Sequence, residues 1–135
     1  MLVIKRIPPQ FLAQRWSEVA PFIEDALAYA GGDYTLEQVK VLLANDTWLL
    51  LAVCDGNIVK GAITVAFSNM PNDRVAFITT IGGRHITSSD TYSQFARILK
   101  QFGATKIQGA ARPSVARLWR KIGFTERYII VEKQI

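Results

Sequence analysis

The sequence contains almost no cysteine or histidine. Its one cysteine is Cys54 and its one histidine is His85. A single cysteine excludes an internal disulfide, and the chain lacks the CxxC motifs and Cys/His spacings from which structural zinc sites are built. We therefore expect no metal cofactor and a reducing, cytoplasmic setting. Because Cys54 lies in an apolar run with no histidine near it in sequence, we predict that it packs in the core and is not a nucleophile.

Long uninterrupted apolar segments are also missing. The short apolar run at residues 1–9 contains Lys5 and Arg6, cannot span a membrane, and lacks the cleavage site of a signal peptide. The chain shows no internal repeat, linker or low-complexity stretch. Half of its 135 residues are apolar, which is enough to bury one core without disulfides. We therefore predict a single domain over residues 1–135.

Negative charge is scarce in the second half of the chain. Residues 1–83 carry six Lys/Arg and eight Asp/Glu, whereas residues 84–135 carry ten and three. The net charges are −2 and +7, which together give the overall +5. A basic half of this kind suits a nucleotide cofactor, a nucleic acid or an acidic partner, and it can also be a plain solvated surface.

The spacing of apolar residues predicts four helices. The first begins near Leu12 and is ended by Gly31-Gly32, and Pro21 either kinks it or opens a second helix. The next has a capping box, in which Thr35 and Gln38 satisfy each other's backbone N–H groups. The ranges expected to be helical are residues 12–30, 35–44, 91–102 and 113–122.

Apolar and β-branched runs predict the strands. The second and third flank the turn residues Asp55-Gly56-Asn57 and form a hairpin. Asp73 and Arg74 flank the following turn, which we interpret as solvated rather than as an acceptor contact. The expected strands are residues 2–7, 48–54, 58–67, 75–81, 106–110 and 127–132. Together with the helices they give the order βααβββαβαβ, an α/β fold with a mixed central sheet flanked by helices.

The helix expected at residues 113–122 has distinctive ends. Pro113 suits the first helical turn, Gly123 suits a left-handed cap, and Phe124 can tuck beneath the sheet. Any well-capped helix can show these features. With the element order added, however, the segment resembles the late helix of the GNAT (GCN5-related N-acetyltransferase) superfamily. That helix has an Asn near its start, then a Leu-Tyr pair and a Gly-Phe pair, at the offsets of Arg112, Leu118-Trp119 and Gly123-Phe124 here.

The resemblance implies an acetyl-CoA site with a pyrophosphate loop, R/QxxGxG/A, after the fourth strand. With Arg84 as the first residue of this motif, Thr87 and Ser89 stand where the family has glycine. The loop equally suits plain N-capping of the next helix by Ser88, Ser89 or Asp90. The implied cofactor-binding residues lie on the fourth strand, in this loop and at the start of the late helix: Thr79, Thr80, Ile81, Arg84, His85, Ile86, Thr87, Ser88, Ser89 and Arg112.

The residue expected to protonate the departing thiolate differs from the family pattern. Trp119 stands in place of the family's usual Tyr, and an indole donates a hydrogen bond but is no acid at neutral pH. His85 is a second catalytic candidate because its unperturbed pKa lies near neutrality, although a lone loop histidine is commonly a surface residue. Tyr92 and Tyr128 are further substitutes.

The leading functional hypothesis is an N-acetyltransferase that moves an acetyl group from acetyl-CoA to a primary amine of a small molecule or protein. The first alternative is a protein that keeps a GNAT-like fold, has lost the cofactor chemistry and serves as an interaction or assembly component. Small divergent members of this kind resemble some bacteriophage-encoded proteins. The second is a nucleic-acid-directed modifier that uses the basic half, although no nucleic-acid module is recognisable. After Phe124 only one strand's length of chain remains, so a homodimer can complete the acceptor pocket. We expect no membrane partner.

Overall fold

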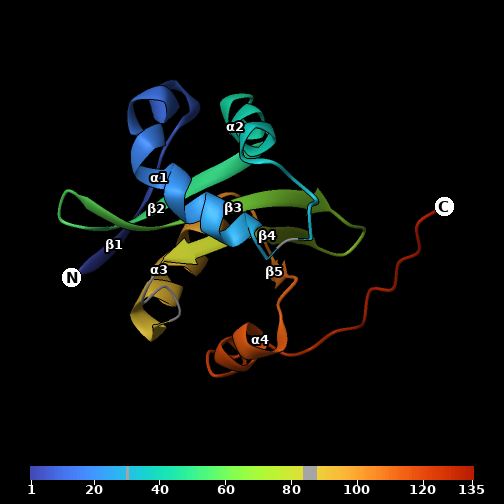
Figure 1. The fold of residues 1–135 in the computed structure, drawn as a ribbon. Helices are drawn as coiled ribbons and strands as arrows, with labels where there is room; N and C mark the ends of the chain where they lie inside the picture. The colour runs from blue at the N-terminus through green and yellow to red at the C-terminus, as the bar shows by residue number, and fades with distance from the viewer. Residues whose placement is uncertain (30, 84–87) are drawn as a thin grey trace.

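The computed structural model describes residues 1–29, 31–83 and 88–135 (Figure 1). The described residues form a five-stranded sheet in the order β1-β2-β3-β4-β5. Four strands are antiparallel neighbours, and β5 runs parallel to β4. The strands are β1 (Leu2–Arg6), β2 (Trp48–Asp55), β3 (Ile58–Asn69), β4 (Arg74–Gly83) and β5 (Lys106–Gly109). The predicted α/β class and mixed sheet are confirmed.

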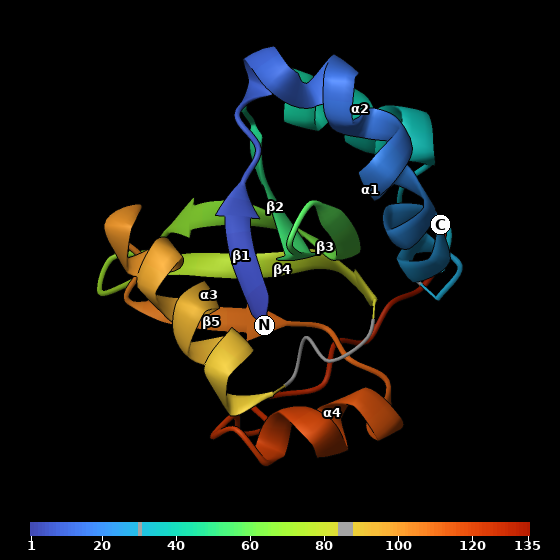
Figure 2. The same cartoon turned by 90° about the vertical axis from the view of Figure 1, so that its left-hand side faces the viewer.

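Helices cover both faces of this sheet (Figures 1 and 2). One face packs against α1 (Leu12–Leu27), which follows the 3-10 turn η1 (Pro9–Phe11), and against α2 (Leu36–Ala44). The other face packs against α3 (Ser89–Gln101) and α4 (Pro113–Arg120). A sheet covered on both faces needs central strands that are apolar throughout.

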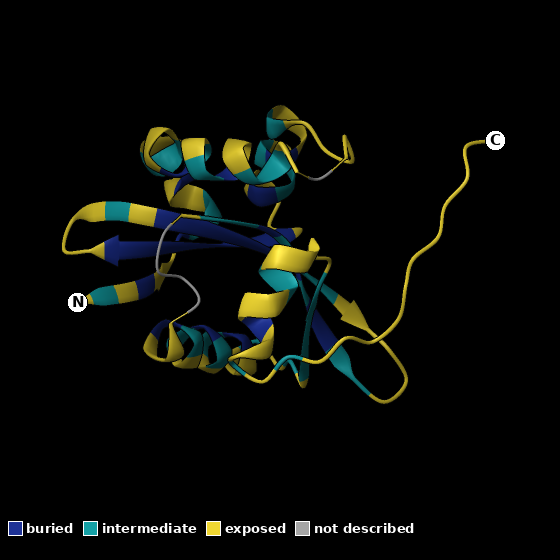
Figure 3. Cartoon of the chain, turned by 60° about the horizontal axis from the view of Figure 1, so that its bottom comes forward, coloured by how far each residue is buried: buried dark blue, intermediate teal, exposed yellow. Residues whose placement is uncertain are grey.

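Strand β2 shows why its apolar run is nearly continuous. Successive side chains of a strand point to opposite faces, so Leu49 and Leu51 join the core beneath α3 and α4, while Leu50 and Cys54 join the core beneath α1 and α2. Figure 3 shows buried residues concentrated in these central strands. The side chain of Cys54 is buried, as predicted.

The two N-terminal helices agree with the predicted pattern except at Pro21. This residue lies inside one continuous helix, so it does not open a second one. Helix α1 ends at Leu27, three residues before the predicted end, which lies outside the described residues. The capping box before α2 is present: Thr35 Oγ1 accepts from Gln38 N at 3.2 Å, and Thr35 N donates to Gln38 Oε1 at 2.9 Å.

Helix α4 has the predicted first residue and the predicted glycine after its end. Pro113 is its first residue, with Arg112 as the N-cap. Past its C-terminal end, Gly123 has a φ of 100°, in the left-handed region that favours glycine. The backbone N–H of Phe124 then donates to the carbonyl of Trp119 at 3.1 Å. Only the length differs, since the helix stops at Arg120 and not at residue 122.

The predicted final strand at residues 127–132 does not form. Residues 125–135 form neither helix nor strand, and their chain leads away from the sheet toward the C-terminus (Figure 1). An extended segment becomes a strand only when a neighbouring strand pairs with its backbone. Residues 127–132 have the composition of a strand but no described neighbour with which to pair. The observed order of helices and strands therefore agrees with the prediction as far as α4.

Candidate functional site

Strand β5, at the edge of the sheet, pairs with only part of β4. They pair from Val75↔Lys106 to Ile78↔Gly109, where β5 ends. Strand β4 continues to Gly83 and stays paired with β3. Residues 79–83 therefore have one edge with no described strand partner, and backbone groups on such an edge can pair with an extended ligand. We call this region, bounded by residues 79–83 and the end of β5, the β4–β5 opening.

A polar cluster holds the two strands together at their other end. Thr105 Oγ1 lies 3.0 Å from Asp73 Oδ1 and Lys106 Nζ lies 3.1 Å from Asp73 Oδ2. The backbone N–H of Arg74 donates to Thr105 Oγ1 at 3.0 Å. The hydrogen bonds from Lys106 and Thr105 hold the pKa of the Asp73 carboxyl below its ordinary value. The turn that we expected to be merely solvated thus fixes the closed end of the strand pair.

A β-bulge marks the point where the opening begins. Thr64 of β3 pairs with Thr80, whereas Val65 pairs with Ile78, so Thr79 is the extra residue of β4. The hydroxyl of Thr64 lies 2.7 Å from that of Thr79 and 2.6 Å from that of Thr80. The side chains of Thr64 and Thr80 are buried. Two hydrogen bonds among three hydroxyls use two protons, which leaves one O–H to donate elsewhere.

Thr64 is a residue of this site that was not predicted from the sequence. The sequence does contain a feature that could have indicated it, because Thr64 is a polar residue inside the apolar run of the third predicted strand. A buried hydroxyl requires a partner, and Thr79 and Thr80 provide it. Only the pairing of β3 with β4 reveals that these three residues meet.

Helix α1 lies directly against the end of β4. A β-carbon on Gly82 would be 2.2 Å from the carbonyl oxygen of Phe22 in α1. No side chain fits in this space, so glycine is required there. The fourth strand was predicted to end at residue 81, but Gly82 and Gly83 are also paired with β3 as part of β4.

Two helices begin at the same end of the sheet as the opening. Because β4 and β5 are parallel, α3 and α4 both start beyond the carboxyl ends of these strands, where α/β sheets commonly bind ligands. Ser88 caps α3, and its Oγ accepts from Thr91 N at 3.3 Å. Among the predicted roles of the loop, this capping is confirmed. The side chain of the N-cap residue Arg112 makes no capping hydrogen bond to α4, so the first backbone N–H groups of the helix can bind solvent or a ligand.

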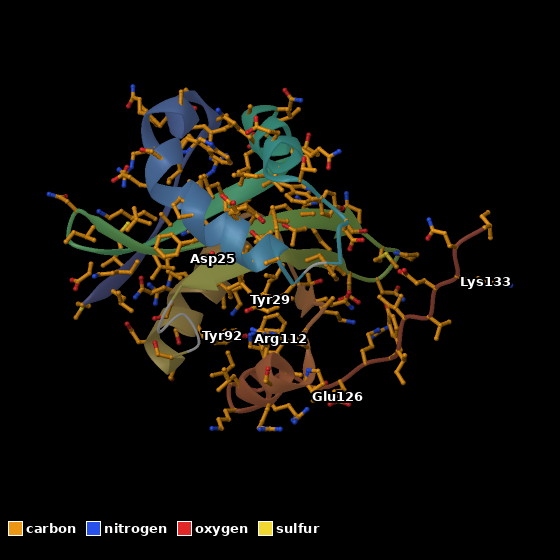
Figure 4. All side chains as sticks on the ribbon, viewed as in Figure 1. Asp25, Tyr29, Tyr92, Arg112, Glu126 and Lys133 are labelled. Atoms are coloured by element: carbon orange, nitrogen blue, oxygen red, sulfur yellow. The ribbon has the colours of Figure 1, made fainter. Side chains whose placement is uncertain are left out.

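Arg112 connects α4 to α1 across this end of the molecule. Its guanidinium carbon lies 3.8 Å from the centre of the Tyr29 ring, a cation–π contact just beyond the end of α1 (Figure 4). Both side chains are exposed. The contact places a permanent positive charge at the start of α4, where the family has an uncharged Asn.

The predicted cofactor-binding residues that the structure describes fall into two groups. Thr79, Thr80 and Ile81 lie on the part of β4 whose β5-facing edge has no described strand partner, and Ser88, Ser89 and Arg112 lie at the two helix starts. The other four, which include the catalytic candidate His85, lie outside the described residues: Arg84, His85, Ile86 and Thr87.

Trp119 lies in the hydrophobic core. Its side chain is 6% exposed, and its ring stands so close to Gly109 that a β-carbon there would be 2.8 Å from two ring carbons. The Phe124 ring is 5.4 Å away. Of the other candidates, Tyr92 packs edge-on against Phe124 at 5.9 Å. Tyr128 is 68% exposed on the C-terminal stretch.

Within residues 1–29, 31–83 and 88–135, no group of three or more His, Cys, Asp or Glu side chains is placed to hold a metal ion. In the same part of the chain, none of the helices combines the length and the apolar character needed to cross a membrane.

Comparison with known proteins gives structural likeness only. No protein-family model matches the sequence, and no curated protein matches it significantly. An aminoglycoside acetyltransferase from an uncultured soil metagenomic sample, in complex with sisomicin, is 13% identical over 99% of this chain and 95% of its own, with a TM-score of 0.72. A predicted acetyltransferase from Clostridium acetobutylicum with acetyl-CoA is 14% identical over 99% and 96%, with a TM-score of 0.66.

A third structure carries the family name. It is a GCN5-related N-acetyltransferase from Ralstonia eutropha JMP134, 15% identical over 99% of both chains, with a TM-score of 0.68. The likeness to all three structures extends over nearly the whole chain. It confirms the GNAT fold that the late helix and the element order predicted.

Proposed function

Since the chain has the GNAT fold, we propose that it is an acetyl-CoA-dependent N-acetyltransferase that acetylates a primary amine of a small molecule. The observation that carries the proposal is the β4–β5 opening. Residues 79–83 present an unpaired backbone edge beside the starts of α3 and α4. An extended ligand with amide groups and phosphates needs both of these features.

The residues around the opening fit CoA in most respects. Backbone groups of residues 79–81 would pair with the amides of the pantetheine arm, Ser88 and Ser89 would donate to the pyrophosphate, and Arg112 would pair with a phosphate. Asp90 in the first turn of α3 opposes an anion there. The bound thioester supplies an activated acyl group, and the chain supplies its binding and orientation.

Catalysis in this proposal depends on positioning more than on proton transfer. A backbone N–H at the Thr79 bulge would polarise the acyl carbonyl, and the buried Thr64 hydroxyl would hold the bulge in place. Trp119 donates no proton at neutral pH and lies in the core. His85 is our candidate for protonating the leaving thiolate, and Tyr92 and Tyr128 are the substitutes among the described residues.

The acceptor that we propose carries positive charge besides the amine that reacts. Glu24 and Asp25 are exposed on the C-terminal half of α1 (Figure 4 labels Asp25). This half of α1 touches the unpaired end of β4 through Phe22 and Gly82. Carboxylates beside the opening favour a polycationic amine. The sisomicin complex of the soil aminoglycoside acetyltransferase supports the same class of acceptor.

The test is acetyl-CoA-dependent release of free CoA thiol in the presence of sisomicin, spermidine or a neutral monoamine. We expect release with the cationic amines, and an Arg112→Ala variant should raise the KM for acetyl-CoA by about tenfold, the loss of one charge-assisted contact. Lys5→Ala removes an equally exposed cation from β1 and should change nothing. No release with any amine, together with no acetyl-CoA binding, would refute the proposal.

The second candidate function is that of an assembly component: a protein that keeps the GNAT fold but has lost the cofactor chemistry. The burial of Trp119 favours it, because the position of the family's acid is filled by a packing residue. This candidate predicts a folded protein that neither binds acetyl-CoA nor releases CoA. The basic surface for the nucleic-acid alternative is partly neutralised, since Arg120 pairs with Glu126 at 2.6 Å.

A further inference from the structure

The contact between Tyr29 and Arg112 joins the two helical layers of the molecule. Helix α1 packs on one face of the sheet and α4 on the other. Wherever strands are present, the sheet keeps the side chains of the two layers apart. Tyr29 follows the end of α1 and Arg112 precedes the first residue of α4, and the guanidinium carbon lies 3.8 Å from the ring centre (Figure 4). We call this contact the Tyr29–Arg112 bridge.

The bridge lies beside the β4–β5 opening. Arg112 follows the last residue of β5, Gly109, by three residues, so their Cα atoms are no more than about 11 Å apart. Tyr29 follows Phe22 by seven residues, a rise of about 10 Å along a helix, and Phe22 lies against the end of β4 at Gly82. The two ends of the bridge are therefore fixed to the two strands that border the opening.

The guanidinium of Arg112 keeps its hydrogen-bond donors available. Contact with a ring uses the face of this planar group, whereas its five N–H donors point outward in the plane. Arg74 also lies over a ring, that of Phe67, but its donors are used inside the protein. They bind the carbonyl of Phe102 at 2.9 Å and Asn69 Oδ1 at 2.8 Å. Within residues 1–29, 31–83 and 88–135, the side chain of Arg112 makes no hydrogen bond or ion pair, so its donors can bind a ligand.

The start of α3 is less suited to an anion than the family motif implies. Ser89 stands where the family has glycine, and its β-carbon limits how closely a ligand can approach the backbone. Asp90 adds a negative charge in the first turn of the helix. The start of α4 differs in the opposite sense, since Arg112 replaces an uncharged Asn. Among the described residues of the cofactor site, the positive charge therefore comes from the α4 side of the opening.

We propose that Tyr29 is a positioning residue for cofactor binding: its ring holds Arg112 beside the opening, where the guanidinium pairs with a phosphate of CoA. A free arginine side chain loses rotamer freedom when it binds a ligand. The bridge restricts that freedom before the cofactor arrives, and Tyr29 itself touches no atom of the cofactor. The inference rests on the proposed function, because it explains how the same site recognises an anion.

The first test measures the binding of CoA itself by calorimetry, which requires neither an acceptor nor turnover. Tyr29→Leu keeps an apolar side chain but removes the ring, and it should weaken CoA binding by about two- to fivefold, the effect of one exposed cation–π contact. Tyr29→Phe retains the ring and should bind CoA as the unaltered protein does. Phe11→Leu is the control, because it removes an aromatic ring that is 47% exposed at the opposite end of α1, and it should change nothing.

The second test separates positioning from a direct contact or a general structural effect. With Arg112→Ala already present, Tyr29→Leu should cause no further loss of CoA affinity, because the ring then has no cation to hold. An equal loss with and without Arg112, or normal CoA binding by Tyr29→Leu alone, would overturn this inference and leave the proposed function intact. No binding of CoA by the unaltered protein would overturn both.

Discussion

A β-carbon on Gly82 would lie 2.2 Å from the carbonyl oxygen of Phe22, so α1 and the unpaired end of β4 meet backbone to backbone. The helix therefore lies directly over the strand whose free edge is the proposed cofactor site. Any residue larger than glycine at position 82 must push the two elements apart. The position of α1 and the shape of the opening are thereby coupled.

Gly82→Ala should therefore lower both stability and acetyl-CoA affinity. The clash is with backbone, which cannot move aside as a side chain can, so we expect a loss of about 1–3 kcal/mol in the free energy of unfolding. Urea denaturation measures it. Gly56→Asn is the control, because a β-carbon at Gly56 meets nothing within 4 Å and asparagine tolerates its φ of 61°. Equal stability of the two variants would contradict the observed packing.

Thr64→Val keeps the shape of the side chain but removes the hydroxyl that joins Thr79 to Thr80. Leaving a buried polar group without its partner costs about 1–3 kcal/mol. If the bulge orients the acyl group, kcat should also fall more than the KM for acetyl-CoA rises. Thr64→Ser retains a hydroxyl and should recover part of both losses. A Thr64→Val enzyme with unchanged stability and kcat would show that the cluster has no role.

Gly109 and Trp119 should be coupled energetically. The β-carbon introduced by Gly109→Ala would lie 2.8 Å from two ring carbons of Trp119, and overpacking of this kind costs about 1–3 kcal/mol. Combining it with Trp119→Phe should restore part of that loss, by a coupling of about 1 kcal/mol in a double-mutant cycle. Trp48 belongs to the opposite core, so Gly109→Ala with Trp48→Phe should be additive.

Asp73→Asn should destabilise the protein only where the carboxyl is ionised. Its pKa is lowered by Lys106 and Thr105 from the ordinary 3.8, so ionised Asp73 stabilises the folded state. That contribution is fully present above pH 3.8 and is lost as the pH falls through the lower pKa of the folded state. Urea denaturation at neutral pH and well below pH 3.8 checks this. An Asp73→Asn variant that loses the same stability at both pH values would contradict this role of the carboxylate.

The sequence predicted most of the fold because its local signals agree with its tertiary contacts. The capping box at Thr35, the cap at Gly123 and the turn at Gly56 each act over a few residues, and the structure has all three. Residues 127–132 failed as a strand for the opposite reason. Their composition favours a strand, but a strand also needs a neighbouring strand, and none pairs with them among the described residues.

The site was less predictable, because it arises from contacts between distant segments. The end of β4–β5 pairing at Gly109, the bulge at Thr79 and the approach of Phe22 to Gly82 all depend on how elements pack. The motif that contains Trp119 correctly predicted a helix, whereas the burial of the Trp119 side chain follows only from the fold. The role of Asp73 likewise required the register of β5 against β4.

Thermal melting with and without acetyl-CoA tests the central claim most directly. A ligand at about 100 times its Kd adds about 2.7 kcal/mol to the stability of the native state, so the account predicts a rise of several degrees in Tm. The rise should shrink in Arg112→Ala and persist in Lys5→Ala. An unchanged Tm at millimolar acetyl-CoA would contradict the account, and the GNAT fold would then serve a function other than acetyl transfer.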